Sequence, residues 1–322
     1  MTNTAMQPDA APLRILVTGA AGFVGSHVVE LLAADSDTNV IATDAGGEGM
    51  LKELDKLDGV TAYSADLRDP CSITSMVRDV DVIVHLAAVR TKASSSNTRD
   101  AHEVNVGSTF DLLTAASVSG AKRFVFGSSH TVYGSFPDAH RAPFAEDEPW
   151  PCAGVNMYAA TKLAGEAYCE AFASTGGPDY LALRLGTIYG PRTSPGSNGS
   201  LMTDLLAAVR DGRTPTIPWA STAQHGLIHV ADVAEAVRRA IFSDATGMAV
   251  NVSGAPRTST EIYGTLAEMA GIDPSAIAFD ENRTRYQLVS QRRMKDVLGF
   301  TPEVELTDGL RSVVEWFDTT SV

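Results

Sequence analysis

Three glycines at a spacing of three, Gly19, Gly22 and Gly25, follow directly on the apolar run 13–18. A short apolar run that ends in glycine predicts a buried parallel strand, and the stretch 27–32 predicts a helix after it. In that context the spacing permits a tight turn and close approach of a pyrophosphate to backbone N–H groups. The helix N-terminus then presents its positive end to the phosphates. A dinucleotide-binding turn is therefore favoured over a glycine-rich turn without a ligand.

Strands and helices alternate as far as about residue 190. Further apolar runs predict strands at 40–43, 60–63, 80–84, 123–126 and 181–185, with helices at 101–117 and 157–173 among them. Alternation of this kind indicates an α/β fold, a doubly wound parallel Rossmann sheet.

The composition of the chain changes after residue 191. Residues 192–199 are rich in Ser, Pro and Gly, which predicts a loop. Helices are expected at about 201–210, 260–270, 291–298 and 307–317, and another opens at 227–234. We predict a disordered leader at 1–12 and an NAD-binding Rossmann domain at 13–190, which also receives about 226–252. Residues 191–225 and 253–322 would form a smaller, partly interleaved, mainly helical substrate-binding lobe.

The charge balance restricts the class of partner. With 25 Lys and Arg against 39 Asp and Glu, the formal net charge is −14. Such an acidic chain is not expected to bind nucleic acid or an anionic membrane, and no apolar run approaches the roughly 20 residues that span a bilayer. A small-molecule substrate is the expected partner.

The cysteines Cys71, Cys152 and Cys169 form neither a C-x-x-C pair nor a zinc-like spacing. We therefore expect a reducing cytoplasm, no metal site, and cysteines that serve as packing residues.

Asp44 closes the second predicted strand, 19 positions after Gly25. A carboxylate there binds the adenosine ribose hydroxyls and repels a 2′-phosphate, which favours NAD over NADP. The segment 45–47 supplies no Arg or Lys that would reverse this preference. The alternative is a solvated aspartate in a turn.

The other predicted cofactor contacts lie at the glycine turn and just beyond the third and fourth strands. Residues 66 and 67 could edge the adenine, and 87 and 88 would leave room for the nicotinamide. Besides Asp44, the set comprises Gly19, Gly22, Phe23, Val24, Gly25, Asp66, Leu67, Leu86, Ala87 and Ala88.

Tyr158 and Lys162 are four residues apart on a predicted helix and so share one face. An ammonium beside a phenol stabilises the phenolate and lowers its pKa. The pair could then exchange a proton with an alcohol near neutral pH. Because Y-x-x-x-K occurs often by chance, its weight comes from the predicted cofactor site upstream.

Six motifs occur in one order from about Leu13 to Phe317: T-G-A-A-G-F-V-G-S-H, H-L-A-A, G-S-S-H-T-V-Y-G, Y-A-A-T-K, I-Y-G-P-R and H-V-A-D-V-A-E-A. Together they resemble extended short-chain dehydrogenases/reductases, in particular the NAD-dependent epimerase/dehydratase group that includes nucleotide-sugar epimerases. The resemblance implies that Ser129 orients a substrate hydroxyl, Tyr158 transfers its proton, and Lys162 binds the nicotinamide ribose and stabilises the tyrosinate. It also implies a structural role for Asn105 and a homodimer.

Two positions depart from the pattern of relatives that eliminate water or carbon dioxide. Those relatives carry carboxylates after the Ser/Thr, where this chain has His130 and Thr131. Thr131 is what 4-epimerases of the group often have. His130 could shuttle a proton, but a packed histidine is favoured.

The substrate side departs as well. Nucleotide-sugar relatives commonly carry Asn where Thr187 stands and Arg where His225 stands, and a histidine is a weaker diphosphate ligand than a bidentate arginine. Arg192, Arg213, Arg283 and Arg285 are possible replacements or simply surface arginines. The residues expected to contact substrate are Ser129, His130, Thr131, Thr187, Arg192 and His225.

These motifs imply an NAD-dependent epimerase that transiently removes hydride from a hydroxyl-bearing carbon of a sugar, with a nucleotide-linked sugar favoured. Net dehydrogenation or reduction of a sugar or other secondary alcohol is the main alternative, because the first half-reaction is shared. Elimination or decarboxylation lacks its carboxylates. A non-catalytic NAD-sensing scaffold is the least favoured, because Tyr158 and Lys162 are both kept. The substrate itself is not predicted.

Overall fold

The computed structural model describes residues 11–134, 143–148, 154–193 and 200–320. Cys152 and residues 1–10 of the expected leader lie outside the described residues.

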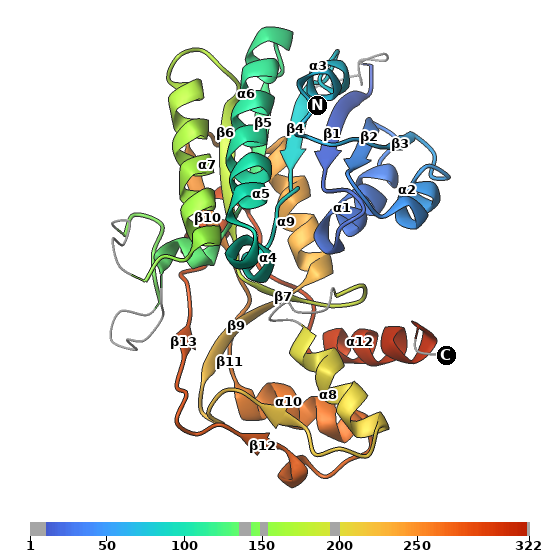
Figure 1. The fold of residues 1–322 in the computed structure, drawn as a ribbon, viewed down its shortest axis with the longest axis vertical. Helices are drawn as coiled ribbons and strands as arrows, with labels where there is room; N and C mark the ends of the chain where they lie inside the picture. The colour runs from blue at the N-terminus through green and yellow to red at the C-terminus, as the bar shows by residue number, and fades with distance from the viewer. Residues whose placement is uncertain (1–10, 135–142, 149–153, 194–199, 321–322) are drawn as a thin grey trace, which may run out of the picture.

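A seven-stranded, fully parallel sheet organises the chain (Figure 1). The strand order is β3-β2-β1-β4-β5-β6-β10. The bounds are β1 Leu13–Thr18, β2 Thr38–Asp44, β3 Val60–Ser64, β4 Val82–His85, β5 Arg123–Ser129, β6 Asp179–Leu185 and β10 Met248–Val252. The predicted doubly wound Rossmann sheet is confirmed. Strand order reverses between β1 and β4, the place where open α/β sheets bind their ligands.

Helices cover both faces of this sheet, because its strands alternate buried side chains between two apolar layers. One layer holds α1 (Phe23–Ala33), α2 (Glu48–Leu54), α9 (Val230–Phe242) and α11 (Arg292–Leu298). The other holds α3 (Pro70–Met76), α6 (Ser108–Ser119) and α7 (Met157–Ala173). Between β4 and α6 lie α4 (Thr91–Ser96), α5 (Thr98–His102) and the π-helical turn η1 (Glu103–Gly107).

A smaller lobe lies at one end of the sheet (Figure 1). Its core is shared by α8 (Ser200–Arg210), α10 (Ser259–Met269) and α12 (Leu306–Thr320). Short strands join it to the sheet: β7 (Thr187–Tyr189), β9 (Gln224–His229), β11 (Pro256–Thr258) and β13 (Tyr286–Gln287), with β8 (Thr216–Ile217) pairing β12 (Ala278–Phe279). Among the described residues, no helix has both the length and the apolar character that a bilayer crossing requires.

Two expectations about this part of the chain were wrong in detail. The helix expected from Leu227 begins at Val230, because Leu227 and Ile228 extend β9 and pair with β7. The helix expected at 291–298 is present as α11. Its Met294 and Leu298 side chains pack in the apolar layer that contains α1 and α9, against the main sheet, rather than in the smaller lobe. The last third of the chain therefore serves both lobes.

Candidate active site

The glycine turn lies at the reversal in strand order, pressed against the loop after β4. Gly19 has φ of +72°, and a Cβ on it would stand 2.6 Å from the Ala87 backbone nitrogen. A Cβ on Gly25 would stand 2.1 Å from the Gly19 carbonyl oxygen. Gly22 begins α1 without a side-chain cap. Only glycine fits the two crowded positions, and the turn leaves the helix N-terminus open to a phosphate.

Asp44 ends β2 with its carboxylate at the same turn. One carboxylate oxygen accepts from the Ala21 N–H at 3.1 Å and the other from the Gly46 N–H at 3.2 Å. The acidic group is thus held beside the glycine turn, where an adenosine ribose diol would reach it. This geometry fits the predicted NAD site.

The remaining predicted cofactor residues divide between the turn and the protein interior. The Leu86 and Ala87 N–H groups donate to the Thr18 carbonyl and hydroxyl oxygens, at 3.2 and 3.4 Å, so the loop through Ala88 runs along the turn. Leu67 is buried in the core. The Phe23 ring packs edge-on against His27, and Val24 packs against the α1 layer. Asp66 is engaged by Arg68, as described below.

Tyr158 and Lys162 lie on the first two turns of α7, whose N-terminus is capped by the Asn156 side chain at 2.9 Å. Lys162 is 3% exposed, with its ammonium 4.9 Å from the ring centroid of Phe126 and 5.6 Å from that of Tyr158. Burial lowers the pKa of Lys162 to about 8, against the smaller opposing effect of Cys169 and Glu166. A buried ammonium over aromatic faces is held by cation–π attraction.

The phenol of Tyr158 differs from the expectation. Burial raises the pKa of Tyr158 to about 12, and the positive charge of Arg90 opposes this rise. Desolvation of the phenolate, rather than the neighbouring ammonium from which a lowered pKa was expected, dominates the pKa of Tyr158 in the folded chain. A lowered phenol pKa is therefore not a property of this protein without its cofactor.

Ser129, His130 and Thr131 follow one another at the end of β5, at the edge of the sheet that carries the glycine turn. The Thr131 N–H and hydroxyl donate to the Ser129 hydroxyl oxygen, at 3.2 and 3.1 Å. That leaves the Ser129 proton available for a ligand. Burial, with a smaller effect of Arg285, lowers the pKa of His130 to about 3. A neutral imidazole is not an acid at neutral pH, so the packed role is favoured.

A buried ion pair connects the end of β5 with β6 and α7. Arg184 on β6 binds Glu166 on α7 through two hydrogen bonds, at 3.0 and 2.8 Å, with both side chains almost fully buried. Ser128 donates to the same carboxylate at 2.5 Å. Arg184 also donates to the Tyr133 hydroxyl at 2.9 Å. Sequence reasoning missed this network, although charged residues within apolar elements were a signal of it.

Asn105 links the loop after β4 to α7, the helix that carries Tyr158 and Lys162. Its side-chain oxygen accepts from the Val89 N–H at 2.7 Å, and its amide donates to the Val89 carbonyl at 2.9 Å and to the Thr161 hydroxyl oxygen at 3.0 Å. Thr161 in turn donates to the Tyr158 carbonyl at 2.7 Å. The geometry agrees with the structural role expected for Asn105.

The smaller lobe contributes a cationic group next to the end of β5. The positive charge of Arg285 adds to the effect of burial in lowering the pKa of both His130 and His225, so Arg285 lies in their neighbourhood. The guanidinium groups of Arg283 and Arg285 each lie 4.7 Å from the ring centroid of Trp219. Trp219 was missed, because its partners are brought to it only by the pairing of chain segments far apart in sequence.

The two predicted substrate residues of the smaller lobe, Thr187 and His225, lie on the paired strands β7 and β9 and are buried. His225 Nε2 lies 2.9 Å from the Ser259 hydroxyl oxygen. Burial lowers the pKa of His225 to about 4, so it is neutral at pH 7. It cannot replace the charge of an arginine.

The side chain of Arg192 points toward α1. Its backbone φ is +67°, and its guanidinium binds the Glu30 carboxylate on α1 at 2.9 and 2.6 Å. The structure thus separates Arg192 from the other predicted substrate residues. Among the residues described, no group of three or more His, Cys, Asp or Glu side chains could hold a metal ion.

A doubly wound sheet with this glycine turn, an acid closing β2 and a Ser–Tyr–Lys group is typical of extended short-chain dehydrogenases/reductases. The sequence matches the NAD dependent epimerase/dehydratase family over residues 15–253. A UDP-glucose 4-epimerase of Mycolicibacterium smegmatis is 32% identical, over 95% of this chain and 98% of that protein. A dTDP-glucose 4,6-dehydratase of Streptomyces griseus is 30% identical, over 94% of this chain and 93% of its own.

Solved structures give the same result. A UDP-N-acetylglucosamine 4-epimerase from Methanobrevibacter ruminantium, in complex with UDP-N-acetylmuramic acid, superposes with a TM-score of 0.84 at 26% identity, over 97% of this chain and all of that one. MoeE5 in complex with UDP-glucuronic acid and NAD gives 0.79 at 29% identity, over 95% and 99%. The chain belongs to the NAD-dependent epimerase/dehydratase family and is an enzyme of the extended short-chain dehydrogenase/reductase type. NAD is the cofactor of this family.

Proposed function

We propose that the protein is an NAD-dependent epimerase that inverts a hydroxyl-bearing carbon of a nucleotide-linked sugar, with carbon 4 as the expected position. One observation carries the proposal: the Ser129–Tyr158–Lys162 group is complete, while the two positions after Ser129 hold a neutral histidine and a threonine. Redox chemistry is supported at this site, and a second, eliminating step is not.

The residues of the cofactor lobe fit NAD. Crowding of Gly19 and Gly25 against neighbouring backbone keeps the turn tight, as a pyrophosphate-binding turn requires, and Asp44 stands beside it at the expected ribose position. NAD, when bound, would supply the hydride acceptor and a positively charged nicotinamide ring. The division into a cofactor lobe and a substrate lobe, with Thr187 and His225 on the substrate side, is part of the proposal.

In the proposed mechanism the chain itself moves one proton. The Ser129 hydroxyl, already accepting two hydrogen bonds from Thr131, donates to the substrate oxygen and orients it. The Tyr158 oxygen takes the proton of the substrate hydroxyl and returns it at the end of the cycle. The ammonium of Lys162 favours the phenolate electrostatically. With a phenol pKa of about 12, the site depends on further positive charge to make the phenolate accessible at neutral pH.

Elimination is disfavoured because neither of the two positions after Ser129, which hold His130 and Thr131, carries a carboxylate. In dehydratase relatives, acidic residues follow the Ser/Thr at the end of this strand. Here the carboxylate of Glu166, which contacts the end of β5 through Ser128, is bound by Arg184 and Ser128. A carboxylate held this way is a structural ion pair rather than a general base.

A nucleotide-linked substrate is supported by the cationic group of the smaller lobe and by the relatives. Arg283 and Arg285 stand together beside Trp219, so positive charge and an aromatic surface occur in one place. Arginine binds phosphate through paired hydrogen bonds, and an indole can stack a base. The relatives named above act on or bind UDP- and dTDP-sugars.

Net oxidation or reduction of a secondary alcohol is the second candidate. The observation in its favour is that His225 is buried and neutral where nucleotide-sugar relatives carry a charged arginine. A weaker phosphate site would suit a substrate without a diphosphate.

The test begins with mass spectrometry of what the freshly purified, denatured protein releases. We expect stoichiometric NAD(H), because an epimerase recycles its cofactor in place. Incubation with UDP-glucose, UDP-N-acetylglucosamine and dTDP-glucose should then invert one of them, without net build-up of reduced nicotinamide and without solvent deuterium at the inverted carbon. Net NADH formation would instead establish the dehydrogenase, and a 4-keto-6-deoxy product would establish a dehydratase. A Tyr158→Phe variant should keep NAD and lose turnover by about 10²–10⁴-fold.

The proposed enzyme is a homodimer of the cytoplasm. Phe110 on α6 is 44% exposed, and its ring contacts Tyr168 and Phe172 of α7 at centroid distances of 5.4 Å. An exposed aromatic patch on two adjacent helices supports a homodimer in which this face is covered. The free thiols of Cys71 and Cys169 are compatible with the cytoplasm.

A further inference from the structure

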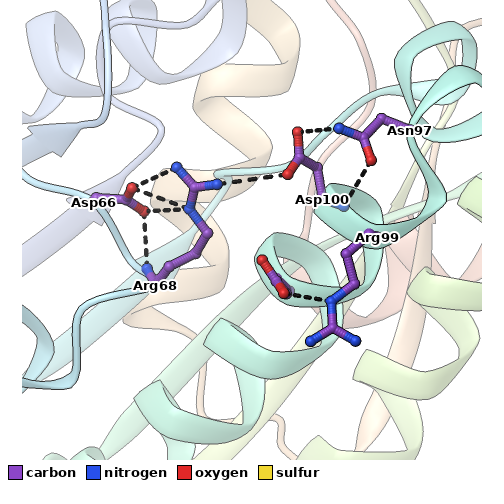
Figure 2. A network of polar contacts seen from close by, with 6 residues as sticks. Asp66, Arg68, Asn97, Arg99 and Asp100 are labelled. Atoms are coloured by element: carbon purple, nitrogen blue, oxygen red, sulfur yellow. Dashed lines mark hydrogen bonds and ion pairs between the residues drawn. The ribbon is translucent and has the colours of Figure 1, made fainter.

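Arg68 forms several hydrogen bonds to the carboxylate of Asp66, just beyond β3 (Figure 2). Its Nε lies 3.0 Å from both carboxylate oxygens, its Nη2 lies 2.6 Å from one of them, and its backbone N–H donates at 2.9 Å. These hydrogen bonds hold the pKa of Asp66 below its usual range. Asp66, the residue expected to edge the adenine, is therefore fixed and kept charged.

The far side of the same guanidinium reaches a different part of the chain. Arg68 Nη1 lies 3.5 Å from a carboxylate oxygen of Asp100 on α5. Asp100 is held in turn by Asn97, whose side-chain amide donates to its carboxylate at 2.6 Å and accepts from its N–H at 3.2 Å. Figure 2 shows Arg68 between the two aspartates. One cation thus joins the loop after β3 to the junction of α4 and α5.

That junction leads into the active site. After α5 the chain continues through the η1 turn to Asn105, which fixes the loop after β4 and the Thr161 side chain in the middle of the Y-x-x-x-K motif. The Asp66–Arg68–Asp100 bridge therefore connects the adenine end of the cofactor site to the element that positions its nicotinamide end. Without Arg68, two carboxylates would face each other and repel.

We propose that Arg68 is a positioning residue that braces the adenine side of the site against the α4–α5 segment and thereby governs how long the cofactor stays bound. The proposal rests on the function proposed above, in which NAD binds along the glycine turn. Arg68 acts through Asp66 and Asp100 and takes no part in proton or hydride transfer. Its loss should change cofactor exchange and leave the chemical step intact.

The test compares Arg68→Gln with Arg99→Gln in the purified holoenzyme. Arg99 is a matched control, because it lies on the same helix as Asp100 but its side chain is 79% exposed and pairs with Glu103, at 2.5 Å, rather than with Asp66 or Asp100. Exchange of bound NAD for isotopically labelled NAD is followed by mass spectrometry. The turnover number is measured with saturating NAD, and thermal unfolding of the cofactor-free variants checks the fold.

We expect Arg68→Gln to speed NAD exchange by about threefold to tenfold, because the variant loses a partly exposed ion-pair bridge. Its turnover number at saturating NAD should stay within about twofold of the wild-type value. Arg99→Gln should match the wild type. Adding Asp100→Asn to Arg68→Gln should slow exchange again, because the repulsion is removed. Wild-type exchange should quicken with added salt, and that of Arg68→Gln should respond less.

Unchanged exchange in Arg68→Gln, or an equal change in Arg99→Gln, would overturn this role while the proposed function stood. A wild-type protein that binds no NAD would overturn the proposed function, and this role with it.

Discussion

Lys162 offers a test of whether this site is maintained at the expense of stability. Its ammonium is buried over two aromatic rings, and burial lowers its pKa from an ordinary 10.5 to about 8. At 1.36 kcal/mol per pKa unit, that difference means the folded state at pH 7 is about 3 kcal/mol less stable than it would be with an unperturbed lysine. Lys162→Met keeps the length and removes the charge. The cofactor-free variant should therefore be more stable than the wild type by up to about 3 kcal/mol at pH 7.

The sign of the pH dependence follows from the same values. Between about pH 8 and 10.5 the unfolded chain binds a proton at Lys162 that the folded chain has released, so wild-type stability rises with pH over this window. The advantage of Lys162→Met should consequently shrink to about 1.4 kcal/mol at pH 9.5. The free energy of unfolding is measured by urea denaturation of the cofactor-free proteins at both pH values. A variant less stable than the wild type at pH 7, or a gap that does not narrow by pH 9.5, would refute the reasoning.

Three further outcomes are expected. Gly25→Ala should lose bound NAD on purification because its Cβ would stand 2.1 Å from a carbonyl oxygen, whereas Gly49→Ala, with nothing within 4 Å, should retain it; released NAD is measured after denaturation. Arg184→Met should lower the free energy of unfolding by about 3–5 kcal/mol, because it leaves a buried carboxylate unpaired; a loss below 1 kcal/mol in urea denaturation would contradict this. Phe110→Glu should convert the expected dimer to a monomer by light scattering, and a monomeric wild type would refute the dimer itself.

The sheet and its glycine turn could be predicted because their signals are local. Each central strand is a continuous apolar run, since both faces of the sheet are covered, and the glycines are dictated by crowding within a few residues. The position of Asp44 beside the glycine turn could be predicted for the same reason, because it follows from where the second strand ends in the sequence.

The substrate side could not be predicted so well because it depends on long-range pairing. Trp219 meets Arg283 and Arg285 only because the segments around 220 and 283 hydrogen-bond to each other. Arg192 belongs to a matching motif, yet its backbone turns it toward Glu30. The raised phenol pKa of Tyr158 likewise arises from burial by the whole fold, which no pair of residues encodes.

The seventh strand of the main sheet has a consequence for synthesis of the protein. β10 pairs with β6, yet it is separated from β6 by the first half of the smaller lobe. At about 5–20 residues per second, the ribosome takes several seconds to make the stretch between residues 185 and 248. During that interval β6 has an unpaired, apolar edge, a template for pairing between nascent chains. A fragment that ends near residue 190 should therefore aggregate rather than fold, and the newly made enzyme should benefit from a chaperone that covers this edge.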